Sequence, residues 1–169
     1  MTVITSEAPR VIAQAPIPFD LEFLFSYELE FSVPPEVIGP VSNGLRVNFS
    51  FLGGTFKGPR LRGKVLTTGG DQLLLRRDGV ALLDMKGTFQ TDEGALIGAA
   101  FPAIMDLGPD GYQTLLGGEL APDGTPFRSV PRYETAAEDL AWINRLQCVG
   151  IGQVFPSIGI ARCDIYAVK

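Results

Sequence analysis

The alternation of apolar and polar residues in residues 21–31 constrains the fold more than any other feature of this chain. An apolar side chain occupies every second position, and glutamate or serine fills most of the positions between. A period of two is that of a β-strand with one buried face. The apolar series is Leu21, Phe23, Phe25, Tyr27, Leu29 and Phe31. Residues 45–52 repeat the pattern, so the chain is predicted to be built mainly of half-buried strands.

Glycine-containing turns separate the predicted strands. The pair Asp78-Gly79 lies between 71–76 and 80–91 and can supply the positive φ angles of a tight hairpin turn. The spacing of such turns indicates nine or ten strands and favours a closed or nearly closed antiparallel barrel, an all-β fold. Further hairpin turns are predicted at 91–94, 108–111 and 122–125.

One segment near the C-terminus has helical spacing. Thr135 and Glu138 stand three residues apart, as in a capping box where each side chain bonds the other residue's amide. This pattern predicts a short α-helix from Thr135 to about Leu146, lying over a barrel opening or against its wall. Its apolar residues are Leu140, Trp142, Ile143 and Leu146.

Composition limits the compartment and the partners. The chain of 169 residues has a net charge of −5, whereas nucleic-acid binding needs clustered positive charge. It has no apolar run long enough for a membrane helix and no signal-peptide pattern at its start. We expect a cytoplasmic protein without nucleic-acid or membrane partners, with a flexible leader at 1–18 and one domain at 19–169. Cys148 and Cys163 are expected to be reduced core thiols.

The chain contains no histidine. This excludes Ser-His-Asp and Cys-His nucleophile systems and the common histidine-bearing zinc and iron sites. No phosphate loop or dinucleotide-binding fingerprint is present either. We therefore expect no metal and no cofactor, and any chemistry must use carboxylate, lysine, arginine and tyrosine side chains.

Asp84 and Lys86 form the first candidate site. Strand alternation places both on the polar face of 82–90. If that face looks into the barrel, desolvation would raise the pKa of the carboxylate and lower that of the lysine, and the pair could act as a base and an oxyanion stabiliser. The alternative is an exposed ion pair on a solvated face.

Five other residues are candidates, each with a structural alternative. Asp71 follows two glycines, so its carboxylate could either bond turn amides or transfer protons. Arg128 and Glu134 precede the predicted helix and could form a turn network or contact a ligand. Trp142 and Tyr27 lie on apolar faces and could pack in the core or reach a ligand.

Two groups of short motifs carry a family resemblance. The first is GGTFKGPRLRG at 53–63, followed by GGD, DG, LD and TDEGALI, and the second is the series FR, P, ET, AWIN and VGIG at 127–152. In this order and spacing they resemble the domain-of-unknown-function 3237 (DUF3237) family over about 20–168. The resemblance implies a lipocalin-like antiparallel barrel, often oligomeric, with a central cavity.

The chain departs from the family pattern at two places. Gln72 stands where a tryptophan is expected after Asp71, and Lys86-Gly87 stands where the family has Arg-Tyr. If these positions point inward, the smaller side chains enlarge or reshape the cavity. A substrate of another family member would then not transfer to this chain.

These observations lead to one functional hypothesis and two alternatives. The hypothesis is a cofactor-independent isomerase, cyclase or hydro-lyase acting on an aromatic or polyketide-like metabolite, for example by a ring closure like that of chalcone isomerase. Asp71 or Asp84 would move a proton, and Lys86 and Arg128 would stabilise an enolate or phenolate. The alternatives are a binding protein for an apolar ligand and a structural oligomer whose barrel is filled by its eleven phenylalanines. A homo-oligomer is expected.

Overall fold

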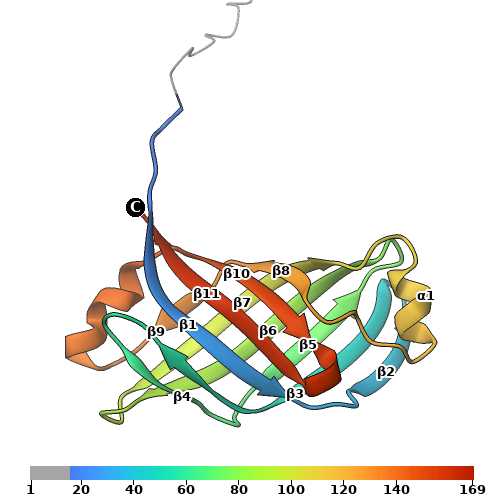
Figure 1. The fold of residues 1–169 in the computed structure, drawn as a ribbon, viewed down its shortest axis with the longest axis horizontal. Coiled ribbons are helices and arrows are strands. Elements are labelled where there is room, and N and C mark those ends of the chain that lie inside the picture. Colours follow the sequence, from blue (N-terminus) through green and yellow to red (C-terminus); the bar gives the residue numbers. More distant parts are fainter. Residues whose placement is uncertain (1–15) are drawn as a thin grey trace, which may run out of the picture.

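A computed structural model describes residues 16–169, where eleven antiparallel strands form one sheet that closes into a barrel (Figure 1). The predicted all-β barrel is therefore confirmed. Most of the predicted leader lies outside the described residues. The strands are β1 (Leu21–Phe31), β2 (Glu36–Val41), β3 (Gly44–Lys57), β4 (Arg62–Val65), β5 (Gly70–Leu75), β6 (Val80–Thr91), β7 (Leu96–Asp106), β8 (Thr125–Ser129), β9 (Arg132–Glu134), β10 (Cys148–Phe155) and β11 (Ile160–Val168).

Eight of the strands in residues 16–169 form the closed ring, in the order β1, β3, β5, β6, β7, β8, β10, β11 and back to β1. The β6–β7 pairing is an unbroken ladder from Val80 opposite Asp106 to Gln90 opposite Leu96. At two places in the barrel wall, two short strands pair one after the other with the same neighbouring strand. Both β4 and β5 pair with β3 and β6, and both β8 and β9 pair with β7.

The predicted strands follow the alternation except in β1, where a bulge between Phe23 and Phe25 turns Leu21 and Phe23 outward and buries Leu24. The strand β2 was missed. Its residues are mostly exposed and it pairs only with β3, outside the ring, so it has no alternating apolar face to mark it. The turns at Gly79 and Gly94 form hairpins as predicted, each with a positive φ at glycine. The turn at 108–111 instead leads into the α-helix α1 (Gly111–Leu116), and the turn at 122–125 leads from the segment after α1 into β8.

The predicted C-terminal α-helix is a 3₁₀-helix, η1 (Glu138–Arg145). The capping box does not form, because the Thr135 hydroxyl donates to the Leu96 carbonyl at 2.7 Å and accepts from the Ala137 amide. The Thr135 amide donates instead to Asn144 Oδ1 at 2.8 Å. Thr135 thus connects η1 to the start of β7. A second 3₁₀-helix, η2 (Pro156–Ile158), links β10 and β11. Within residues 16–169, no helix has the length and apolarity needed to cross a membrane.

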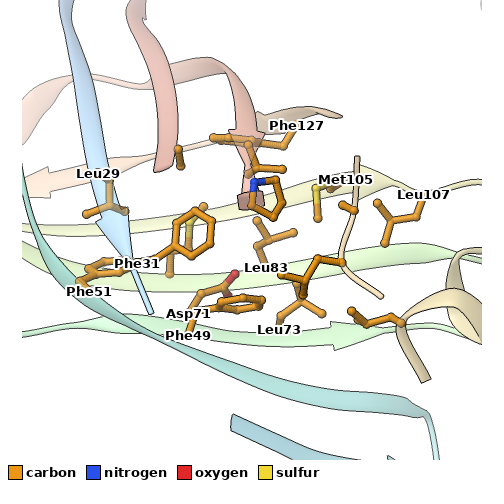
Figure 2. Close-up of a pocket in the computed structure, with 17 residues that line it drawn as sticks. Leu29, Phe31, Phe49, Phe51, Asp71, Leu73, Leu83, Met105, Leu107 and Phe127 are labelled. Atoms are coloured by element: carbon orange, nitrogen blue, oxygen red, sulfur yellow. The ribbon is translucent and has the colours of Figure 1, made fainter. Parts of the chain in front are cut away.

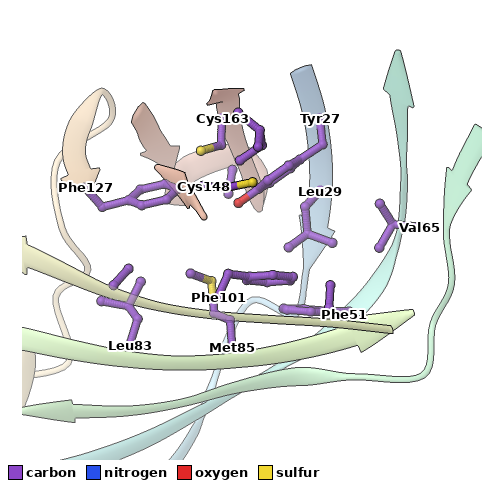
Figure 3. Packing of buried hydrophobic residues seen from close by; sticks show 14 of the residues in the cluster. Tyr27, Leu29, Phe51, Val65, Leu83, Met85, Phe101, Phe127, Cys148 and Cys163 are labelled. Carbon is purple, nitrogen blue, oxygen red and sulfur yellow. The ribbon is translucent and has the colours of Figure 1, made fainter. Parts of the chain in front are cut away.

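Aromatic rings fill the half of the barrel nearer η1. Phe89 lies at their centre, with its ring centroid between 5.2 and 6.2 Å from those of five neighbours. The neighbours are Phe25, Tyr27, Phe56, Phe101 and Tyr133. Figure 3 shows how Tyr27, Phe51 and Phe101 project from the wall into this interior. Phenylalanine and tyrosine rings therefore fill this half of the barrel.

We expect Phe89→Ala to lower the free energy of unfolding by about 3 to 5 kcal/mol, because it removes a fully buried ring and leaves a cavity. Phe23→Ala is the matched control, since that ring is 39% exposed and packs against Tyr166 on the outside. Its cost should be about 1 kcal/mol or less. Urea denaturation measures both values, and equal losses would contradict a core organised around Phe89.

Candidate functional site

The half of the barrel nearer α1 contains a cavity of about 70 Å³. Its lining is apolar except for one carboxylate, that of Asp71 (Figure 2). Six of the lining residues are half-buried and border its mouth: Phe31, Phe49, Leu107, Leu120, Ala121 and Val154. The lining consists of Leu29, Phe31, Phe49, Phe51, Asp71, Leu73, Leu83, Met85, Met105, Leu107, Leu115, Leu120, Ala121, Phe127, Val154, Pro156 and Ala161.

Asp71 reaches the cavity because it shares the inward face of β5 with Leu73 and Leu75. Its side chain is almost completely buried, with 6% of the residue exposed. Oδ1 accepts a hydrogen bond from the Asp84 amide at 2.9 Å. Within residues 16–169, Oδ2 makes no hydrogen bond. One oxygen is thus fixed to the wall while the other is free for a ligand.

The Asp71 side chain also replaces a backbone hydrogen bond between β5 and β6. The β5–β6 ladder pairs Asp71 with Met85 and then resumes at Leu74 opposite Leu82, so residues 72 and 73 are skipped. The Asp84 amide donates to the Asp71 carboxylate, and the Gln72 carbonyl accepts from Arg46 Nη1 at 2.6 Å. Asp71 therefore does bond a backbone amide, but on the neighbouring strand and not in its own turn.

Burial raises the pKa of Asp71 to about 7, from an ordinary value of 3.8. The hydrogen bond from the Asp84 amide opposes this rise, the negative charge of Asp84 adds to it, and the positive charge of Arg46 lowers the pKa. A carboxyl group with a pKa near 7 can both accept and donate a proton at neutral pH.

Asp84 and Lys86 lie on the outer face of β6, so the interpretation that places them inside the barrel is wrong. Their side chains are 53% and 69% exposed, and Lys86 Nζ lies 3.1 Å from Asp84 Oδ1. The alternative, an exposed ion pair, is confirmed. The inward positions of β6 include those of Leu83, Met85 and Phe89.

Three of the predicted ligand contacts also lie outside the cavity. Gln72 and Arg128 are exposed on strands whose neighbouring residues point inward, and Arg128 donates to the Phe127 carbonyl. Glu134 lies in an outer groove that also contains Lys86. Gly87 does point inward, but the Phe51 ring occupies the space where its side chain would be, 3.0 Å from an added Cβ.

The two aromatic candidates have different positions. Trp142 is half-buried on η1, with the Arg60 guanidinium 3.7 Å above its ring centroid, so it packs outside the cavity. Tyr27 is buried inside the barrel, and its hydroxyl has no hydrogen-bond partner. Cys148 and Cys163 are free, buried thiols, as predicted.

The cavity wall was only partly visible in the sequence. Phe49 and Phe51 belong to an alternating strand and could be assigned to its inner face. No sequence signal indicates the role of Arg46. This residue lies on the polar face of the same strand, and its side chain donates to the Gln72 carbonyl, which the β5–β6 ladder leaves unpaired. Only the folded sheet shows that residues 72 and 73 are skipped.

A family model described as a protein of unknown function (DUF3237) matches residues 19–168. The chain belongs to the DUF3237 family. A UPF0311 protein from Rhodopseudomonas palustris (strain TIE-1) is 33% identical over 114 residues, which are 66% of this chain and 74% of the relative. The family resemblance inferred from the sequence is thereby confirmed.

Solved structures show the same fold as this DUF3237 protein. A β-barrel-like protein from Acinetobacter baumannii AYE has a TM-score of 0.77 and 27% identity, covering 92% of this chain and 99% of its own. A protein from Penicillium herquei, described as an enzyme, has a TM-score of 0.70 and 20% identity, covering 94% and 100%. At that identity the likeness establishes the fold alone.

The raised pKa of Asp71 predicts a pH-dependent stability. The folded state binds the Asp71 proton more tightly than the unfolded state, so protonated Asp71 stabilises the fold by an amount on the order of 4 kcal/mol. This stabilisation is fully present below about pH 4 and is lost as the pH rises through about 7. Asp71→Asn cannot ionise, so we expect the variant to gain stability relative to wild type from pH 4 to 8, as measured by urea denaturation.

Asp92→Asn is the control for this prediction. Asp92 is an exposed carboxylate paired with Arg62 at 3.2 Å, and its replacement should leave the slope of stability against pH close to that of wild type. Parallel pH profiles for wild type and Asp71→Asn would contradict the raised pKa.

Proposed function

We propose that this protein is a cofactor-independent enzyme that transfers protons on an aromatic or polyketide-like small molecule, as an isomerase, cyclase or hydro-lyase. The observation that carries the proposal is Asp71. It combines a pKa of about 7 with one oxygen facing a cavity whose other lining side chains are apolar. Catalytic carboxylates are commonly tuned toward neutral pH in this way.

The geometry supports a simple proton cycle. The ionised Asp71 would remove a proton from a hydroxyl or an activated C–H group, and the protonated Asp71 would return it to another atom of the same molecule. For an isomerase or a cyclase, such a cycle is balanced without an added reactant and yields an isomer or a ring-closed product. A hydro-lyase would in addition release or take up one water molecule. The Asp84 amide holds Oδ1 in place, so Oδ2 is oriented before the substrate binds.

The expected roles of Lys86 and Arg128 as oxyanion stabilisers are not part of this proposal, because both side chains are on the outer face. The same holds for Asp84 as an alternative base. Asp71 is the acid–base residue. The charge that develops on the substrate must be met by uncharged donors.

Substrate entry requires the mouth of the cavity to open. A volume of about 70 Å³ is well below the roughly 300 to 1,000 Å³ of ordinary ligand pockets. Leu120 and Ala121 follow α1 and close the mouth without being fully buried. Met85 and Met105 line the cavity and have flexible side chains that can repack around a ligand.

The Penicillium herquei neighbour adds support, since a protein of this fold is described there as an enzyme. A non-catalytic carrier is the second candidate, and the apolar lining favours it. The carrier would bind the same kind of ligand and leave it unchanged. A third possibility, the filled structural barrel, would bind none.

The first test is a thermal-shift screen of aromatic and polyketide-like metabolites, followed by mass spectrometry and chiral chromatography of each incubated hit. We expect conversion by wild type, with kcat/KM rising with pH through about 7 when Asp71 acts as a base. Asp71→Asn should bind the ligand and lose conversion by about 100-fold or more. Asp84→Asn and Lys86→Met are matched controls, and both should keep conversion. Binding by all four proteins without conversion would favour the carrier.

A second test concerns the mouth. We expect Ala121→Trp to abolish binding of the screened ligand, because the larger ring fills the entrance beside Leu120, while the half-buried position leaves the melting temperature nearly unchanged. Isothermal titration calorimetry measures the affinity. Leu96→Trp, on an exposed position away from the cavity, is the control. Undiminished binding by Ala121→Trp would contradict this entrance.

A further inference from the structure

Three hydroxyl groups inside the barrel have no hydrogen-bond partner among residues 16–169. They belong to Tyr27, Ser129 and Tyr133, which are 3%, 3% and 6% exposed. Buried hydroxyls are nearly always satisfied by protein or by ordered water, so three orphans in one small barrel indicate that something else completes them. Neither the fold nor the role of Asp71 accounts for them.

The three hydroxyls gather around the Cys163 thiol. Burial raises the pKa of Cys163 to about 12, and the Tyr27 and Ser129 hydroxyls, which approach the thiol without hydrogen-bond geometry, oppose that rise. Tyr133 is close enough for its charge to act on Tyr27. A Cβ added to Gly150 would lie 2.1 Å from Ser129 Oγ and 3.0 Å from Cys163 Sγ, so these two groups border the same inward-facing glycine. Figure 3 shows the Tyr27 phenol reaching inward beside Cys163.

This cluster forms the layer next to the Asp71 cavity. On β1, Leu29 lines the cavity, and Tyr27 is the next inward residue. On β8 the corresponding pair is Phe127 and Ser129, and on β11 it is Ala161 and Cys163. Two residues along a strand span about 7 Å, so on β1, β8 and β11 the hydroxyl layer lies about 7 Å from the residues that line the cavity.

The neighbouring inward positions are small. Ala103 on β7 lies opposite Ser129, and so does Gly150 on β10. Neither position carries a large side chain into the layer. Burial raises the pKa of Tyr27, and the negative charge of Asp71 adds to the rise. The layer therefore combines unsatisfied donors with small wall residues at the inner end of the cavity.

We propose that Tyr27, Ser129 and Tyr133 form a polar subsite that binds a phenolic or carbonyl oxygen of a ligand whose apolar body lies in the Asp71 cavity. This inference rests on the proposed function and names its substrate class, a phenol or an enolisable ketone. Hydroxyl donors bind such an oxygen more strongly as it gains negative charge, which is what proton removal by Asp71 produces. They supply the uncharged stabilisation that the exposed Lys86 and Arg128 cannot give.

The subsite is tested with a matched pair of probes, 4-nitrophenol and nitrobenzene, titrated into the full chain by calorimetry below the pKa of the phenol. We expect wild type to prefer 4-nitrophenol by about 10-fold. The double variant Tyr27→Phe with Ser129→Ala should lose that preference and bind nitrobenzene as wild type does. Tyr133→Phe, which alters one ring by a single oxygen, should reduce the preference in part. Tyr166→Phe removes a hydroxyl from the outer face and is the control.

Each outcome decides the inference separately from the proposed function. Equal affinity of wild type for the two probes, or no binding of either at millimolar concentration, would overturn it. A lower melting temperature of the double variant with unchanged probe preference would show that the hydroxyls hold structural water only, which also overturns it. If the preference holds and Asp71→Asn converts every screened ligand as wild type does, the subsite stands and the proposed function of Asp71 fails. If Asp71 is needed for conversion and the preference is absent, only the subsite fails.

Discussion

The pairing of β6 with β7 is the interaction on which the rest of the structure depends. Without it, the ten strands other than β2 would form an open, twisted sheet with two free edges, at β6 and at β7. With it, every strand acquires an inside and an outside, and the alternation of the sequence becomes a division between a core and a solvated wall. The burial of Asp71 and the exposure of Asp84 are both consequences of this closure.

The interior that closure creates is divided along its length. Toward η1, the rings around Phe89 pack against one another across the barrel. Toward α1, smaller aliphatic side chains and two methionines leave a cavity, and the one carboxylate lies in its wall. The aromatic half supplies the rigidity that a desolvated carboxylate needs, since burying such a group costs free energy that the packing must offset.

The sequence predicted the strands better than the site, for a physical reason. Period-two alternation states which residues of a strand share a face, and it placed 21–31 and 80–91 with their correct ends. It cannot state which face is inside when both are chemically plausible, so the sequence alone leaves Asp84 and Lys86 as candidates for the cavity. Asp71 was recognisable only as a candidate, because its burial depends on strands distant in the sequence. The capping box predicted at Thr135 is absent because its hydroxyl donates to the Leu96 carbonyl, a long-range bond that no local pattern encodes.

The interrupted ladder between β5 and β6 has a consequence for the barrel as a container. Oδ1 of Asp71 accepts a hydrogen bond from the Asp84 amide at a point where the β5–β6 ladder is interrupted, in place of a main-chain carbonyl. The group proposed to exchange protons is therefore also part of the barrel wall. Protonation makes a carboxyl oxygen a weaker acceptor, and the Asp84 amide is then held less firmly. The hydrogen bond between β5 and β6 at this point is therefore stronger when Asp71 is ionised than when it is protonated. The strength of the barrel wall would then change between the two halves of a proton-transfer cycle.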